Sequence, residues 1–144
     1  MKEVKERLAE VLAMFDCRTG TLHAAKCESL TLVSAIGVPD FLLEKIQNIP
    51  FGKGIAGVAA ESKGPVELCN LQQDLGGIAK ENARATGVAG SLAVPIFSAD
   101  GMEVIGVLGI GKTEPYDFTD QEKALLGQEG EKIRAFLSEF IEKL

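Results

Sequence analysis

Apolar residues at helical spacing mark both ends of the chain. Near the N-terminus these positions are Val4, Leu8, Val11, Leu12 and Phe15. They predict an amphipathic helix over residues 2–15. Near the C-terminus the apolar line is Leu126, Ile133, Leu137, Phe140 and Leu144. Because Thr119 is a good N-cap, we expect one helix from there to the end of the chain. Both lines have the rhythm of a helix-pairing seam, which predicts dimerisation through the terminal helices.

Short apolar runs between these helices predict two strand hairpins. Residues 21–25 and 30–36 form the first hairpin, and residues 90–97 and 104–110 form the second. Asp100-Gly101 is a strong turn signal for the second hairpin. Its two strands are apolar almost throughout, which predicts that they are central and covered on both faces.

Two further strand features are expected from local pattern. In the first hairpin, Leu30, Leu32, Ser34 and Ile36 are expected to share one face of the sheet. Residues 65–69 read as a short strand, and because Pro65 cannot donate a ladder hydrogen bond, we place this strand at an edge.

A glycine-rich segment, Ile49–Glu61, stands between the hairpins. Pro50 favours extended backbone before it, and Gly52, Gly54 and Gly57 supply backbone freedom ahead of a short helix of small residues. The spacing fits neither a Walker loop nor a dinucleotide fingerprint. Two interpretations remain: a tight turn that lets the helix lie close on the sheet, or one wall of a small-molecule pocket.

Composition removes several function classes. The net charge is −6 over 144 residues and no basic cluster is present, so nucleic acid is not an expected partner. No apolar run is long enough for a membrane span, and the charged N-terminus is unlike a signal peptide. Cys17, Cys27 and Cys69 read as reduced thiols of a cytoplasmic protein. With one histidine, His23, in a predicted strand, we expect neither a metal site nor a cofactor.

Six segments, in order, resemble a GAF domain. They are the hairpin over 21–36, Ile-Pro-Phe-Gly-Lys-Gly-Ile-Ala-Gly at 49–57, Pro-Val-Glu-Leu-Cys-Asn at 65–70, Ser-Leu-Ala-Val-Pro-Ile at 91–96, Val-Ile-Gly-Val-Leu-Gly-Ile-Gly-Lys at 104–112 and Phe-Thr-Asp-Gln-Glu at 118–122. The resemblance implies an α+β fold with a central antiparallel sheet of about five to six strands. Terminal helices would cover one face, and short helices and loops would cap a pocket on the other. It implies a single domain over 1–144, made of an N-terminal helix (1–16), the sheet and pocket (17–117) and a C-terminal helix (118–144).

The same resemblance implies a free-standing sensory or signalling module that binds a small-molecule ligand. Homodimerisation and a signalling-protein partner are implied with it. The cyclic-nucleotide-binding members carry a signature that this chain keeps only at Lys112, Phe118 and Glu122, while Gly111 and Lys123 depart from it. Bilin attachment is not favoured either, because none of the three cysteines has a histidine neighbour.

Free methionine-(R)-sulfoxide reductases provide the enzymatic alternative. The chain is similar to them around residues 49–57 and 76–79, but their cysteine positions are occupied by Ala56 and Lys80. Their chemistry requires a nucleophilic thiolate and a resolving cysteine. We therefore expect no enzyme activity. A thiol-dependent reductase using Cys69, alone or with Cys27, and a ligand-free dimerisation module remain as alternatives.

The polar stretch 70–86 is the expected cap of the pocket, although a solvated surface loop is an equal alternative. Arg84 and Thr86 would meet a carboxylate or phosphate, and Asp74 and Asn82 would suit amines or hydroxyls. Ser91 and the backbone of residues 54–57 would form the floor. The full set of pocket candidates is Gly54, Ile55, Gly57, Asp74, Ile78, Asn82, Arg84, Thr86 and Ser91.

Overall fold

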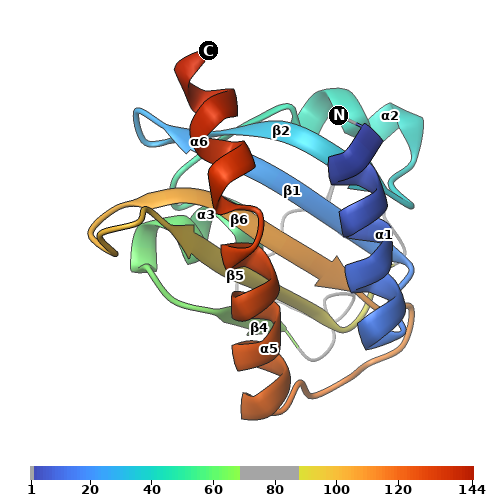
Figure 1. Ribbon diagram of the computed structural model, residues 1–144. Helices are drawn as coiled ribbons and strands as arrows, with labels where there is room; N and C mark the ends of the chain where they lie inside the picture. Colours follow the sequence, from blue (N-terminus) through green and yellow to red (C-terminus); the bar gives the residue numbers. More distant parts are fainter. Residues whose placement is uncertain (1, 69–87) are drawn as a thin grey trace.

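A computed structural model describes residues 2–68 and 88–144, which form an antiparallel sheet between two layers of helices (Figure 1). The helices are α1 (Lys2–Phe15), α2 (Asp40–Leu43), η1 (Glu44–Ile46, a 3₁₀ turn), α3 (Gly54–Ser62), α5 (Asp120–Glu131) and α6 (Arg134–Glu142). The strands are β1 (Thr19–Lys26), β2 (Ser29–Ile36), β3 (Asn48–Pro50), β4 (Val66–Leu68), β5 (Ser91–Phe97) and β6 (Val104–Gly111). This arrangement confirms the predicted α+β class.

The six strands of the sheet follow the order β3-β2-β1-β6-β5-β4. The two predicted hairpins, β1–β2 and β5–β6, lie side by side because β1 also pairs with β6. The short strand after Pro65 lies at one edge, as predicted. Helices α1, α5 and α6 cover one face of the sheet, and α3 covers the other face over β5 and β6 (Figure 1). The polar stretch 70–86, the expected cap of the pocket, lies outside the described residues.

Most residues of the apolar seams of the terminal helices are buried within the chain itself, whereas Phe140 is half-buried and Leu144 is 50% exposed. Val4, Leu8, Val11, Leu12 and Phe15 of α1 pack in one cluster with Leu126, Ile133 and Leu137 of the C-terminal helices. Leu22, Leu92, Val94, Ile96 and Leu108 of the sheet complete this cluster. The seam pattern therefore packs each helix on its own sheet, and these buried residues are not available to a partner helix.

The C-terminal helix differs from its prediction, because it is divided into α5 and α6. The break follows Gly130, where the Ile133 N–H donates to the Gly130 carbonyl at 3.0 Å, three residues back instead of four. Gly130 lies directly against the sheet: an added Cβ there would come within 2.9 Å of Ile96. Close contact with the sheet and the low helix propensity of glycine together favour the tighter turn.

The predicted alternation along β2 is also wrong in one respect. Leu22 pairs with Ser34 while His23 pairs with Leu32, so Val33 is an extra residue on β2. A bulge of this kind exchanges the two faces of a strand for the residues beyond it. Leu30 accordingly packs on the α3 side, whereas Val33 and Ile36 contact the cluster beneath α1.

Gly106 marks a close contact between β6 and the helical layer. A Cβ at this position would lie 2.6 Å from Leu137 Cδ1 and 2.7 Å from the His23 carbonyl oxygen. We predict that Gly106→Ala lowers the free energy of unfolding by about 1–3 kcal/mol, since the backbone contact cannot move aside. Urea denaturation of the purified variant measures the change.

Gly127→Ala is the matched control, because an added Cβ at this position in α5 would have no neighbour within 4 Å. It should raise the free energy of unfolding by about 0.5–1 kcal/mol through helix propensity. Equal effects of the two substitutions would contradict the assignment of Gly106 as a packing contact.

Candidate functional site

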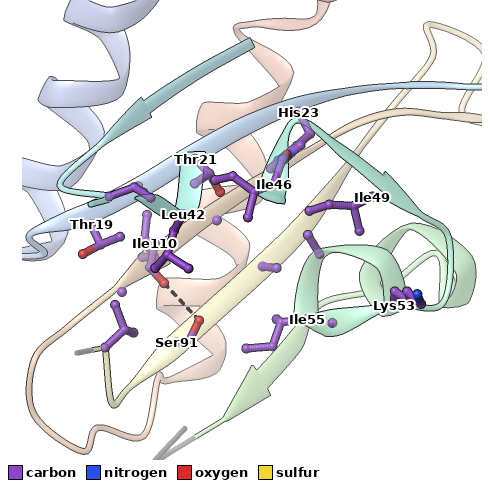
Figure 2. Close-up of a pocket in the computed structure, with 18 of the residues that line it drawn as sticks. Thr19, Thr21, His23, Leu42, Ile46, Ile49, Lys53, Ile55, Ser91 and Ile110 are labelled. Carbon is purple, nitrogen blue, oxygen red and sulfur yellow. Dashed lines mark hydrogen bonds between the residues drawn. The ribbon is translucent and has the colours of Figure 1, made fainter. Parts of the chain in front are cut away.

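A cavity of about 610 Å³ lies on the α3 side of the sheet (Figure 2). Its floor is formed by β1, β5 and β6, and its walls by the segment 38–50 and the start of α3. The lining residues are Thr19, Gly20, Thr21, His23, Val38, Leu42, Lys45, Ile46, Asn48, Ile49, Pro50, Lys53, Gly54, Ile55, Ala56, Val88, Ser91, Leu92, Ala93, Gly109, Ile110 and Gly111.

Two rows of small residues across the sheet explain why this face is hollow. Gly109 on β6 pairs with Thr21 on β1 and with Ala93 on β5. One step along the same face, Gly111 pairs with Thr19 and Ser91. Paired residues on neighbouring strands point to the same face, so neither row contributes a large side chain to this space. Val88 packs over Gly111, where an added Cβ would lie 2.7 Å from its Cγ1, and so borders the cavity at that row. Leu108 and Ile110 alternate with the glycines and belong to the core on the opposite side.

The wall opposite the floor is held to the sheet by hydrogen bonds. His23 Nε2 lies 2.9 Å from the Ile46 carbonyl oxygen, and the Leu32 N–H donates to the Gln47 carbonyl at 2.9 Å. Leu42 of α2 is 1% exposed, so its side chain is packed inside the protein. These contacts fix the position of residues 42–47 above the strands.

His23 is the one buried polar side chain among the described residues of the cavity lining. A carbonyl oxygen can only accept, so Nε2 carries the proton and donates it to Ile46. Nδ1 is then an unprotonated acceptor, and it is buried without a hydrogen-bond partner. Burial lowers the pKa of His23 below its ordinary value, against the smaller opposing effect of the Ile46 carbonyl. The ring is therefore neutral at physiological pH.

Sequence reasoning left His23 as a packed or surface residue and missed its place in the cavity. The available signal was alternation along the strand: Thr19, Thr21 and His23 are two residues apart on β1 and therefore share one face of the sheet, which lines the cavity. Figure 2 shows His23 and Ser91 toward opposite ends of the group of lining residues. Ser91 Oγ donates to the Ile110 carbonyl at 3.5 Å, at the far end of this floor.

The predicted pocket residues divide into three groups. Gly54, Ile55 and Ser91 line the cavity, as expected for the start of α3 and the floor. Gly57 does not line it: its carbonyl accepts from the Gly52 N–H at 2.8 Å, and an added Cβ would lie 2.7 Å from the Pro50 oxygen. It allows α3 to lie close on the preceding turn. Asp74, Ile78, Asn82, Arg84 and Thr86 lie outside the described residues.

The described thiols are not placed for chemistry in this cavity. Cys17 is half-buried, and burial raises its pKa to about 11, despite the opposing charge of Lys112. Cys27 is exposed in the β1–β2 turn. Neither lines the cavity, whereas Ala56, at a reductase cysteine position, does. Cys69 and Lys80 lie outside the described residues. In the ranges 2–68 and 88–144, no group of three or more His, Cys, Asp and Glu side chains could hold a metal ion.

The residues that match the cyclic-nucleotide signature anchor the terminal helices. Lys112 Nζ donates to the Phe15 carbonyl at 2.6 Å, at the end of α1, and lies 4.6 Å from the centre of the Tyr116 ring. Glu122 forms a capping box with Thr119 and accepts from the Tyr116 hydroxyl at 2.9 Å.

The partners of Glu67 extend this anchoring to β4. Glu67 accepts from the Phe118 N–H at 2.6 Å and from Lys123 at 2.9 Å. These two contacts join the edge strand to the start of α5. The cavity lining does not include Lys112, Phe118, Glu122 or Lys123. Their contacts with the terminal helices and β4 explain these residues without a bound ligand.

The chain matches known proteins by family and by fold. A family model described as a GAF domain matches residues 1–137. A GAF domain of a phosphoenolpyruvate-protein phosphotransferase from Coxiella burnetii has a TM-score of 0.77 and 19% identity, over 96% of this chain and 82% of that one. A type II free methionine-R-sulfoxide reductase from Thermoplasma acidophilum has a TM-score of 0.76 and 15% identity, over 96% of this chain and 92% of that one.

A GAF domain/HD domain protein from Geobacter sulfurreducens is similar at a TM-score of 0.74 and 15% identity, over 94% of this chain and 90% of that one. No curated protein sequence matches the chain. At these identities the structural likenesses show the shared fold alone. Among the residues that the structure describes, no helix has the length and apolar character to cross a membrane.

The buried neutral state of His23 makes stability depend on pH. Its pKa lies below the ordinary value of 6.5 in the folded chain, so the unfolded chain binds a proton first as the pH falls. We predict that the free energy of unfolding decreases between about pH 7 and pH 5.5, above the range in which ordinary carboxylates titrate. Urea denaturation at both pH values measures this slope.

His23→Gln is the control variant, since its amide can still donate to the Ile46 carbonyl but does not titrate. The slope should be smaller in the variant than in the wild-type chain. An unchanged slope would contradict the burial of a neutral imidazole.

Proposed function

The chain belongs to the GAF domain family, and from that premise we propose that it binds a small organic molecule in the cavity between the sheet and α3 and acts as a sensory module without catalysis of its own. The observation that carries this proposal is the hollow over the rows Thr21–Gly109–Ala93 and Thr19–Gly111–Ser91. At about 610 Å³, the cavity is within the size range of small-molecule sites.

The chemistry of the lining supports this proposal. Leu42, Ile46, Ile49, Ile55 and Ala93 give it apolar walls and floor. His23, Thr21 and Ser91 add a few polar groups at separate points. Apolar walls with few polar groups are typical of sites that bind a small organic molecule by burial and orient it by hydrogen bonds. A dimerisation module whose pocket is filled by its own side chains is less favoured, because the described residues line a cavity of about 610 Å³.

The lining also weighs against the reductase alternative. The position that would bear a cysteine in the glycine segment is Ala56, which contributes a methyl group to the cavity. A methyl group is not a nucleophile, and Cys17 is held in its thiol form away from the cavity. Binding without thiol chemistry is therefore the function that these residues support best.

Homodimerisation and signalling through a partner protein are part of the proposal. Because most seam residues are buried in the chain's own core, pairing would use the outer surface of the terminal helices. Met14 on α1 and Leu125 on α5 are large apolar residues exposed on this layer, at 51% and 38%. A ligand would act on a partner by changing how these helices pack on the sheet. We also propose a cytoplasmic location, because Cys17 and Cys27 are both free thiols.

Blocking the cavity tests ligand binding directly. Ala56→Phe places a phenyl ring where α3 meets the cavity, so we predict that it weakens binding of the apolar anionic dye 1-anilinonaphthalene-8-sulfonate about tenfold, a change of about 1.4 kcal/mol. Fluorescence titration gives the dissociation constants. Ala13→Phe, on the exposed side of α1, is the matched control and should leave the affinity unchanged. Equal affinities of all three proteins, or no binding by the wild-type chain, would refute the cavity as a ligand site.

A charge on the outer helical layer tests dimerisation. We predict that the wild-type chain sediments as a dimer and that Met14→Glu shifts it toward monomer, since a buried carboxylate at an interface is strongly unfavourable. Sedimentation equilibrium measures the association constant. Met102→Glu, in the exposed β5–β6 turn, is the control and should associate like the wild-type chain. A monomeric wild-type chain would remove dimerisation from the proposal.

A further inference from the structure

We propose that Val88 limits the size of the molecule that the cavity accepts, because its side chain fills the space over one of the two rows of small residues in the floor. The bound molecule then rests on the row of Gly109, and it extends toward the row of Gly111 only as far as Val88 allows. This inference rests on the proposed function, because it assigns a specificity-determining residue to the same cavity.

The side chain of Val88 lies directly on the backbone of Gly111. An added Cβ at Gly111 would lie 2.7 Å from Val88 Cγ1, 3.1 Å from its Cγ2 and 3.5 Å from its Cβ, so the whole isopropyl group faces this glycine. Val88 is buried and belongs to the lining of the cavity. A side chain on residue 111 would displace the valine, so the glycine is what gives Val88 its place.

Hydrogen bonds hold the backbone next to Val88 against the end of β6. The Ala89 N–H donates to the Lys112 carbonyl at 2.8 Å, and the Lys112 N–H donates to the Gly90 carbonyl at 2.7 Å. Gly90 also lies against the segment that follows β6, since an added Cβ there would be 2.9 Å from Tyr116 Cβ. Because this backbone is held and a β-branched side chain has a restricted χ1, Val88 does not turn aside easily for a larger ligand.

The neighbouring row of the floor is different. An added Cβ at Gly109 would lie 3.0 Å from Thr21 Oγ1 and 3.9 Å from the Leu92 carbonyl oxygen, which are atoms of the floor strands themselves. Gly109 and Thr21 both line the cavity. The cavity therefore reaches the strands at this row, whereas at the row of Gly111 it meets the methyl groups of Val88.

The charged group of Lys53 and the side chain of Val88 lie toward opposite ends of the cavity. Lys53 follows Pro50, which pairs with β2 at the turn of the β1–β2 hairpin, whereas Gly111 pairs with the start of β1. Figure 2 shows Lys53 well separated from Ser91, which belongs to the row of Gly111. The ammonium group of Lys53 favours the sulfonate of an anionic dye, so we expect the apolar end of such a dye to point toward Val88.

Two dyes that differ by one methyl group measure the size limit. The dyes 2-anilinonaphthalene-6-sulfonate and 2-(4-toluidino)naphthalene-6-sulfonate are alike except for a methyl group at the apolar end. We expect the wild-type chain to bind the toluidino dye no more tightly than the anilino dye, because Val88 occupies the space that the methyl group would enter. In Val88→Ala the toluidino dye should gain about fourfold in affinity relative to the anilino dye, as expected for one more buried carbon. Fluorescence titration gives the dissociation constants.

Three further variants separate size from stability and polarity. Val33→Ala makes the same change at a buried valine in the core on the other face of the sheet, and it should leave the ratio of the two dissociation constants unchanged. Val88→Thr keeps the branched shape and should also keep this ratio. Gly111→Ala should weaken the binding of both dyes, because it pushes Val88 further into the cavity, and this effect should be smaller in the Val88→Ala background.

A nuclear Overhauser measurement locates the dye without any substitution in the protein under study. With valine labelled at its ¹³C methyl groups, the methyl resonances of Val88 are assigned by their loss in Val88→Ala. They should show contacts with protons of the bound anilino dye, and the methyl groups of Val33 should not.

The outcomes distinguish this inference from the function on which it rests. Equal ratios of the two dissociation constants in the wild-type chain and Val88→Ala, or a bound dye without contacts to the Val88 methyl groups, would overturn the role of Val88 while leaving the cavity a ligand site. If neither these dyes nor 1-anilinonaphthalene-8-sulfonate bind the wild-type chain, the proposed function fails and the inference fails with it.

Discussion

The structure depends on the difference between the two faces of its central strands. On β6, Leu108 and Ile110 fill the core beneath the helices, while Gly109 and Gly111 contribute no side chain to the other face. The Val88 side chain packs over Gly111 on that face. Pairing with β1 and β5 extends this difference across three strands, because Thr21 and Ala93 flank Gly109. One face can then bury the large apolar surface that stabilises the fold, and the other can remain hollow.

The cavity stays open because hydrogen bonds hold the segment above it at a fixed position over the sheet. His23 donates to Ile46, and Leu32 donates to Gln47, so backbone groups of the wall are satisfied by the strands beneath. Side chains that would otherwise collapse into the space, such as Leu42, are already packed. The same histidine that holds the wall lines the cavity, and its other ring nitrogen is buried without a hydrogen-bond partner.

The terminal helices show how one pattern can serve two purposes. A line of apolar residues at helical spacing is equally suited to a neighbouring helix and to a sheet. In this chain Leu8, Val11 and Leu137 are fully buried against the sheet. Lys112 then fixes the end of α1 by donating to Phe15, and Glu67 fixes the start of α5 through Phe118. Lys112 and Phe118, which match part of a ligand signature, therefore help to hold the helical layer in place.

Local pattern was sufficient for much of the architecture. Helical spacing identified α1, apolar runs bounded by turn residues identified both hairpins, and Pro65 placed β4 at an edge. In the candidate site, the start of α3 and Ser91 were also predicted, because the glycine segment and a strand end are visible in sequence. The ordered series of segments further identified the family, since it depends only on residues in sequence.

Other features were decided by contacts between residues far apart in the chain. The bulge at Val33 depends on the pairing of β1 with β2, and the division between α5 and α6 depends on contact of Gly130 with Ile96. The small-residue rows exist only because β6 lies between β1 and β5. The support that His23 gives to the wall became visible only when Ile46 was placed 2.9 Å from one of its ring nitrogens. The sequence by itself determined the elements, their order and the family, because these follow from local spacing. Tertiary structure decided the cavity and the hydrogen bond from His23 that holds its wall, because strand register and long-range contacts set them.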